Sequence, residues 1–183
     1  MSRSSLPLRS LAFAGVAGLL LLGSGCATAS KPSAMIAAPT TAVTHHPESL
    51  SVTVTGGADT SAMGASNIAN ADFAEAIKTS IVQSGLFARI ASGDQSDYQL
   101  DVQIVRLDRP TFGASFTVTL ETTWRLVHRA NQAVVWQKAV ISSFTATMGD
   151  AFAGVTRLRL ANEGAARTNI QDAITQMSAL ALP

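Results

Sequence analysis

The stretch FTVTLETTWRLVHRANQAVVWQKAVISSFTAT, residues 116–147, determines the fold that this sequence predicts. In its first half, apolar side chains alternate with polar ones, which is typical of a strand with one buried face. The apolar positions are Phe116, Val118, Leu120, Trp124 and Leu126. A polar turn at residues 129–132 leads into residues 133–147, which we expect to be the antiparallel partner. We expect Trp124 and Trp136 to pack in the core rather than stack on a ligand.

Three segments before this hairpin also predict strands. Residues 98–104 alternate in the same way, and Pro110 stops that strand. Residues 50–55 alternate and end at a pair of glycines, and residues 87–91 form a short strand. Together with the hairpin, these segments predict a mostly antiparallel sheet of about four to five strands.

A first helix is predicted between the first two strands. Asn70 has a side chain suited to capping the start of a helix. Gly85 suits the left-handed position that ends one. The apolar side chains at helical spacing between them are Phe73, Ile77 and Ile81.

A long second helix is predicted over about residues 155–180. Its apolar stripe consists of Ile170, Ala173, Ile174, Met177 and Leu180. Arg159, Glu163 and Arg167 are four residues apart, and we expect them on an exposed side. Gly164 disfavours a helix, which suggests a close approach to another backbone. Two helices packed on one face of the sheet make an α+β fold.

The first residues of the chain resemble an export signal. Arg3 and Arg9 precede an apolar run over residues 11–22. That run is shorter than the roughly 20 residues that a membrane-spanning helix needs. A positive start, a short apolar run and small residues are the order of a secretory signal.

Ser24, Gly25 and Cys26 then resemble the cleavage box of bacterial lipoproteins. The resemblance implies diacylglycerol on the Cys26 sulfur, cleavage before that cysteine, and a third chain such as palmitate on its new amino group. Several acyl chains give stable anchoring. Ala27 follows where an inner-membrane retention aspartate would stand, which implies the periplasmic face of the outer membrane. The alternative is cleavage after Ala29, at the A-x-A sequence of residues 27–29, which would release a soluble periplasmic protein.

The boundaries that follow are a signal peptide over residues 1–25, a lipidated cysteine with a flexible tether over residues 26–49, and one domain over residues 50–183. The tether is predicted from its content of Ala, Thr, Ser and Pro. His45 and His46 lie in this segment without a third ligand nearby, so we expect them to be solvated rather than to bind metal.

The composition excludes several kinds of partner and site. The net charge is +1 and no basic block is present, so we expect no nucleic-acid partner. The single cysteine precludes an intramolecular disulfide. Two of the three histidines lie in the expected tether, and the third, His128, lies at a hairpin end. No recognised nucleophile, metal or phosphate-loop motif occurs. We therefore expect no catalytic residue, no metal site and no cofactor.

The domain resembles small proteobacterial envelope lipoproteins. The segments that carry this resemblance are SGLF (84–87), DYQLDVQIVRLD (97–108), the hairpin, and GVTRLRLANEGAARTNIQDAI (154–174). Similar patterns occur in auxiliary lipoproteins of ABC transporters, in activators of peptidoglycan synthases and in the N-terminal domain of TolB-like proteins. The last segment resembles an uncharacterised lipoprotein family. The resemblance implies a fold and supplies no catalytic residue.

Two functions of different class follow from this reading. The first is a non-catalytic binding or accessory module that contacts an envelope protein in assembly or transport. Its docking element would be the loop of residues 148–154, with Phe152 among small residues. The other interpretation of Phe152 is a hydrophobic staple that packs on the core at the start of the helix. The second function is the handling of a lipid or another apolar ligand, which requires apolar surface left open on the sheet.

Overall fold

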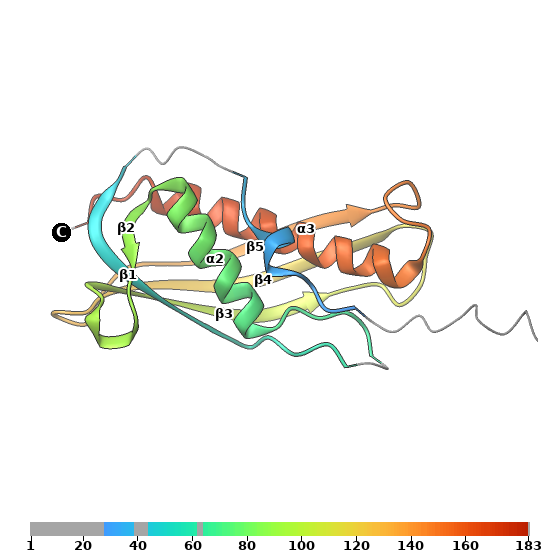
Figure 1. The fold of residues 1–183 in the computed structure, drawn as a ribbon, viewed down its shortest axis with the longest axis horizontal. Helices are drawn as coiled ribbons and strands as arrows, with labels where there is room; N and C mark the ends of the chain where they lie inside the picture. The colour runs from blue at the N-terminus through green and yellow to red at the C-terminus, as the bar shows by residue number, and fades with distance from the viewer. Residues whose placement is uncertain (1–27, 39–43, 62–63, 183) are drawn as a thin grey trace, which may run out of the picture.

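The computed structural model describes residues 28–38, 44–61 and 64–182. Figure 1 shows a single sheet with the helices on one of its faces. The elements are α1 (Pro32–Met35), β1 (His46–Thr55), α2 (Asn70–Ser84), β2 (Phe87–Ile90), a 3-10 turn at Gly93–Gln95, β3 (Tyr98–Asp108), β4 (Phe116–His128), β5 (Ala133–Ala146) and α3 (Gly154–Met177). The predicted α+β fold is confirmed.

The sheet has the strand order β2-β1-β3-β4-β5 and is mixed. β3, β4 and β5 form an antiparallel meander, in which Tyr98 is paired with His128 and Phe116 with Ala146. The antiparallel hairpin predicted from residues 116–147 is thereby confirmed. β1 lies between β2 and β3 and runs parallel to both of them, so the first strand among the described residues is an interior strand.

The core lies between the helices and the apolar face of the sheet, and it encloses one polar network. Trp124 and Trp136 are both buried, which confirms their predicted packing role. The indole N–H of Trp124 donates to Thr122 Oγ1 at 2.7 Å and to Asn169 Oδ1 at 3.1 Å. Asn169 Nδ2 in turn donates to the carbonyl of Val140 at 3.1 Å. Because these buried polar groups satisfy one another, their hydrogen bonds offset the cost of desolvation and tie α3 to β4 and β5.

The two ends of α2 differ in how well the sequence predicted them. Gly85 has a φ of 67°, and the N–H of Leu86 donates to the carbonyl of Ile81 at 3.3 Å, as the predicted helix end requires. The predicted cap at Asn70 is wrong. The cap position belongs to Ala69, and Asn70 Oδ1 instead accepts a bond of 2.7 Å from the N–H of Gly57. Asn70 therefore fastens the end of β1 to the start of the helix.

Gly164 allows α3 to approach an aromatic ring. A Cβ at this position would lie 2.2 Å from Cγ of Phe144, on β5. The close approach predicted from this glycine exists, but its partner is a side chain rather than another backbone.

Part of the segment expected to be a tether packs against the helices. Met35 and Ala37 are buried. The N–H of Ala37 donates to Ser80 Oγ on α2 at 2.9 Å. Its apolar side chains are too few to show a period, which is why composition alone predicted a tether.

This packing covers a side of α3 that we expected to be exposed. Glu163 is only 2% exposed and accepts bonds of 2.9 Å from the N–H of Lys31 and from Arg159 Nη1. Arg167 Nη1 donates to the carbonyl of Ala34 at 3.1 Å. The expectation of a solvated Arg-Glu-Arg row is therefore wrong, because the N-terminal segment lies over it.

The histidine pair also differs from expectation. β1 begins at His46, four residues before the predicted strand, and the His46 ring packs against Phe87 with centroids 5.1 Å apart. His45 Nδ1 lies 2.6 Å from the carbonyl of Gly85. Both rings thus contact the domain, and His46 is buried rather than solvated.

Candidate functional site

The sheet face opposite the helices is mostly polar. Side chains alternate between the two faces of a strand, so the polar set of each strand points away from the helices. Hydroxyl pairs link β4 and β5 on this open face: Thr117 with Thr145, and Thr119 with Ser143, both at 2.8 Å. Other polar residues of this face include Thr53, Thr55, Asp101, Gln103, Glu121, Thr123, Arg125 and Gln137. The face therefore offers mainly hydrogen-bonding groups, although Ile141, which is 63% exposed, also lies on it.

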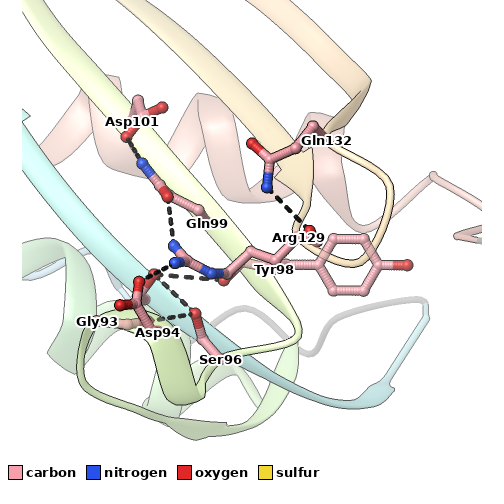
Figure 2. Close-up of polar contacts among 9 residues, drawn as sticks. Gly93, Asp94, Ser96, Tyr98, Gln99, Asp101, Arg129 and Gln132 are labelled. Atoms are coloured by element: carbon pink, nitrogen blue, oxygen red, sulfur yellow. Dashed lines mark hydrogen bonds and ion pairs between the residues drawn. The ribbon is translucent and has the colours of Figure 1, made fainter.

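A row of alternating donors and acceptors crosses this face at one end (Figure 2). The Arg129 guanidinium lies between Asp94, with which it forms an ion pair, and Gln99 Oε1, to which it donates. Gln99 Nε2 donates to Asp101 Oδ1 at 2.6 Å. Asp101 Oδ2 lies 3.4 Å from Arg125 Nη1. Each charge in this Arg129 row therefore has a neighbour of opposite charge.

An open hollow of about 410 Å³ adjoins the Arg129 row. Its polar lining includes Lys78, Gln99 and Arg129. Its size and polarity suit contact with a polar group of a partner. Among the described residues, no group of three or more His, Cys, Asp or Glu side chains is arranged to hold a metal ion.

The titratable groups beside the row serve the fold. Asp97 Oδ2 accepts bonds from Ser49 Oγ at 2.6 Å and from the Ser49 N–H at 2.8 Å. These bonds hold the pKa of Asp97 below its ordinary value, and the bond from the Ser49 hydroxyl has the largest effect. His128 stacks on Tyr98 with centroids 4.9 Å apart. Asp97 and His128 therefore fasten β1 and β4 to β3.

The opposite end of the sheet carries exposed apolar side chains on two loops. Phe112, in the β3–β4 loop, is 86% exposed, and Phe152, in the β5–α3 loop, is 87% exposed. Met148 and Val155, in and just after the second loop, are also exposed. We call these four residues the apolar loop end. The interpretation of Phe152 as a staple packed on the core is wrong, because its side chain is almost fully exposed.

A single buried arginine holds the two loops together. Arg157, on the first turn of α3, is 6% exposed. Its Nη1 donates to the carbonyls of Ala151 and Phe152, at 3.0 and 2.5 Å, and its Nη2 donates to that of Gly113 at 3.1 Å. Its guanidinium lies 5.2 Å from the centre of the Phe116 ring, a cation–π contact. Neither loop can move away without breaking charge-assisted bonds.

A turn stabilises the start of the second loop. Asp150 Oδ2 accepts a bond of 2.7 Å from the N–H of Thr147 and one of 2.9 Å from its hydroxyl. These bonds lower the pKa of Asp150, and the bond from the backbone N–H of Thr147 has the largest effect. Sequence analysis identified this loop through Phe152, but it missed Phe112 and Arg157, because nothing in the local sequence shows that the two loops are neighbours.

The predicted lipid-attachment residue, Cys26, lies outside the described residues. In the part of the chain that the structure describes, no helix is both long enough and apolar enough to span a membrane.

The fold recurs in solved structures of low sequence identity. A Xanthomonas campestris protein of the family DUF330 is 16% identical, with a TM-score of 0.61, and the match covers 82% of this chain and 94% of that one. A hypothetical protein from Chlamydia trachomatis is 10% identical, with a TM-score of 0.52, over 73% of this chain and 99% of that one. At these identities the likeness shows a shared fold alone.

A minor lipoprotein from Acinetobacter baumannii also matches, at 12% identity over 76% of this chain and 100% of that one. Its TM-score of 0.48 is too low to carry an argument. No family model matches the sequence, and no relative is found among curated proteins. The more specific resemblances, to transport auxiliary, synthase-activating and TolB-like proteins, are not confirmed.

Proposed function

We propose that this chain is a lipoprotein anchored through Cys26 at the periplasmic face of the outer membrane. The sequence in front of Cys26 supports the anchor, since it has the charge, length and small residues of an export signal. In the proposed role the protein is non-catalytic and serves as a binding or accessory module in cell-envelope assembly or transport.

The open face of the sheet carries the proposal of a binding module. α2 and α3 pack on one side of the sheet, which leaves the hydroxyl pairs and the Arg129 row on the other side available to a partner. A twisted sheet rich in hydroxyl and amide groups presents fixed donors and acceptors, which favours specific polar contacts. We expect the partner to be an envelope protein.

The alternative of apolar-ligand handling is less well supported. It requires apolar surface left open on the sheet, whereas the open face is mostly polar. The alternative of a soluble protein cleaved after Ala29 meets a different obstacle. It would place a new charged amino group on Ser30, which is 2% exposed, and burying a charge is costly.

The anchor is tested by feeding cells a fatty acid that carries a chemical tag. We expect the wild-type protein to carry the tag and Cys26→Ala to carry none. Ala29→Gln is the matched control, because it disrupts only the competing A-x-A site and should leave labelling unchanged. Tag on Cys26→Ala, or processing that depends on Ala29, would contradict the anchor.

The binding role is tested by photo-crosslinking in cells from the open face. A photoreactive residue at Gln137, which is exposed on β5, should give a discrete protein adduct. The same residue at Glu75, which is exposed on α2, is the control on the helix side. Adducts at Glu75 alone would place the binding surface on the helices. If neither position captures a protein and the purified protein carries non-covalent lipid, the apolar-ligand function replaces this one.

A further inference from the structure

We propose that the apolar loop end faces the membrane and that Phe112 and Phe152 enter its lipid interface. The inference rests on the proposed anchor at Cys26. It assigns the apolar loop end to a bilayer rather than to a protein.

Exposure of two phenylalanines at one end is the first observation. Phe112 and Phe152 are 86% and 87% exposed on neighbouring loops, and the described residues leave them uncovered. The chain contains seven phenylalanines in all. Moving a phenylalanine side chain out of water is favourable, so two of them left in water at one end indicate a surface with an occupant.

The short distance to the anchor is the second observation and identifies the occupant. Cys26 precedes Thr28, the first described residue, by two positions, and two residues span at most about 7 Å. From Lys31 onward the chain is held by Glu163, in the first half of α3. In Figure 1 the described chain begins towards the end of the long axis that carries the β3–β4 and β5–α3 loops, and the C-terminus lies at the other end. The acyl chains on Cys26 would therefore hold a bilayer close to the apolar loop end.

The rigidity of the loops is the third observation. Arg157 bonds to carbonyls of both loops, and Asp150 closes the turn at Thr147. The backbone at Phe152 and next to Phe112 is thus held in place, so little backbone entropy is lost when the two side chains enter the interface. Apolar side chains at an interface typically reach about 5–10 Å into the headgroup and acyl boundary.

The test uses the full, lipidated protein in vesicles of phosphatidylethanolamine and phosphatidylglycerol. Phe152→Cys is labelled with an environment-sensitive fluorophore, and vesicles with brominated acyl chains serve as the quencher. Cys26 is blocked by its lipid, so the new thiol is labelled selectively. Ala130→Cys, in the exposed β4–β5 turn at the opposite end, is the matched control. We expect roughly two-fold quenching at position 152 and none at position 130.

Three other outcomes would overturn the proposal. Equal quenching at both positions would mean that the domain has no fixed orientation. No quenching at position 152, in protein shown to carry lipid on Cys26, would refute the membrane contact but leave the anchor intact. A specific protein adduct from a photoreactive residue at position 152 in cells would assign the loop to a protein partner. Absence of lipid on Cys26 would instead be failure of the proposed function, which the fatty-acid label reports separately.

A second variant guards against loss of fold. Phe112→Ser combined with Phe152→Ser changes only exposed side chains, so the circular dichroism spectrum should be unchanged. A fluorophore on Met148→Cys is the reporter. Quenching at position 148 should be weaker in the protein with both serines than in the Met148→Cys protein that keeps both phenylalanines. Unchanged quenching at position 148 would show that the phenylalanines do not hold the loops at the membrane.

Discussion

The backbone N–H of Lys31 donates a bond of 2.9 Å to Oε1 of Glu163, across 132 positions of sequence. The same oxygen accepts a bond from Arg159 Nη1. Glu163 is buried, so these two donors replace the water that its carboxylate loses on folding. The N-terminal segment is therefore part of the folded domain.

Replacing Glu163 should weaken this attachment. Glu163→Ala leaves Arg159 and the Lys31 N–H without their acceptor, and we expect the free energy of unfolding to fall by about 3 kcal/mol. Glu163→Gln keeps one oxygen acceptor and should lose less. Chemical denaturation of the mature protein measures both, with Glu75→Ala on the exposed side of α2 as control. Equal effects of Glu163→Ala and Glu75→Ala would contradict the role of the buried carboxylate.

Shortening the chain should have a related effect. A chain that begins at Glu48 retains most of β1 and all later elements, so we expect it to fold cooperatively with a mixed α/β circular dichroism spectrum. It lacks the buried Met35, and removing a buried methionine side chain typically costs about 2–5 kcal/mol. A chain that begins at Thr28 should therefore have the higher denaturation midpoint. Identical midpoints would show that residues 28–47 contribute nothing to stability.

Gly164→Ala should destabilise the protein, although alanine favours an isolated helix by about 1 kcal/mol. The new Cβ would overlap the Phe144 ring, and overpacking of this kind costs about 1–3 kcal/mol. Adding Phe144→Leu should restore part of the loss, which a double-mutant cycle measures. Gly149→Ala, in an exposed loop, is the control. A more stable Gly164→Ala protein would mean that the ring moves aside without cost.

Stability should fall as the pH drops below about 6.5 because of His46. Burial lowers the pKa of His46 below its ordinary value of 6.5, an effect that Glu48 opposes. The folded state then binds fewer protons than the unfolded state, so this stability is complete above pH 6.5 and is lost as the pH falls towards the folded pKa.

Glutamine at position 46 cannot titrate, so His46→Gln should reduce the change in the denaturation midpoint between pH 8 and pH 5. His45→Gln is the matched control and should keep most of the dependence. If the midpoint of His46→Gln follows that of the wild type across this range, the dependence arises from other groups.

The features that sequence analysis predicted are local ones. The alternation in residues 116–147 fixes which side of each strand is buried, and Gly85 fixes where α2 ends, because each signal depends on neighbours in the chain. The exposure of Phe152 in a loop next to α3 was foreseen as one of two interpretations. Its use as a docking element stays a prediction.

The missed features depend on distant residues. β1 and β3 pair in parallel and are not joined by a hairpin turn, so no local sequence signal predicts their pairing. The order of the strands therefore comes from the structure. From their composition, residues 28–38 were expected to form a solvated tether. Their partners Ser80, Glu163 and Arg167 lie on helices far along the chain, so the sequence does not show these contacts. Arg157 joins two loops that are neighbours only after the sheet has formed.

The bond between Lys31 and Glu163 also sets an order of events during biogenesis. An exported chain crosses the membrane N-terminus first, so residues 28–38 and β1 arrive long before the elements they pack against. β1 can pair with β3 only after β3 has crossed the membrane. The N-terminal segment can bond to α3 only after the middle of that last helix has crossed. Non-local contacts form late, and unpaired strands are prone to aggregation in the meantime. If the protein is exported as proposed, its nascent chain therefore needs protection from the moment β1 emerges until nearly the whole chain has been translocated.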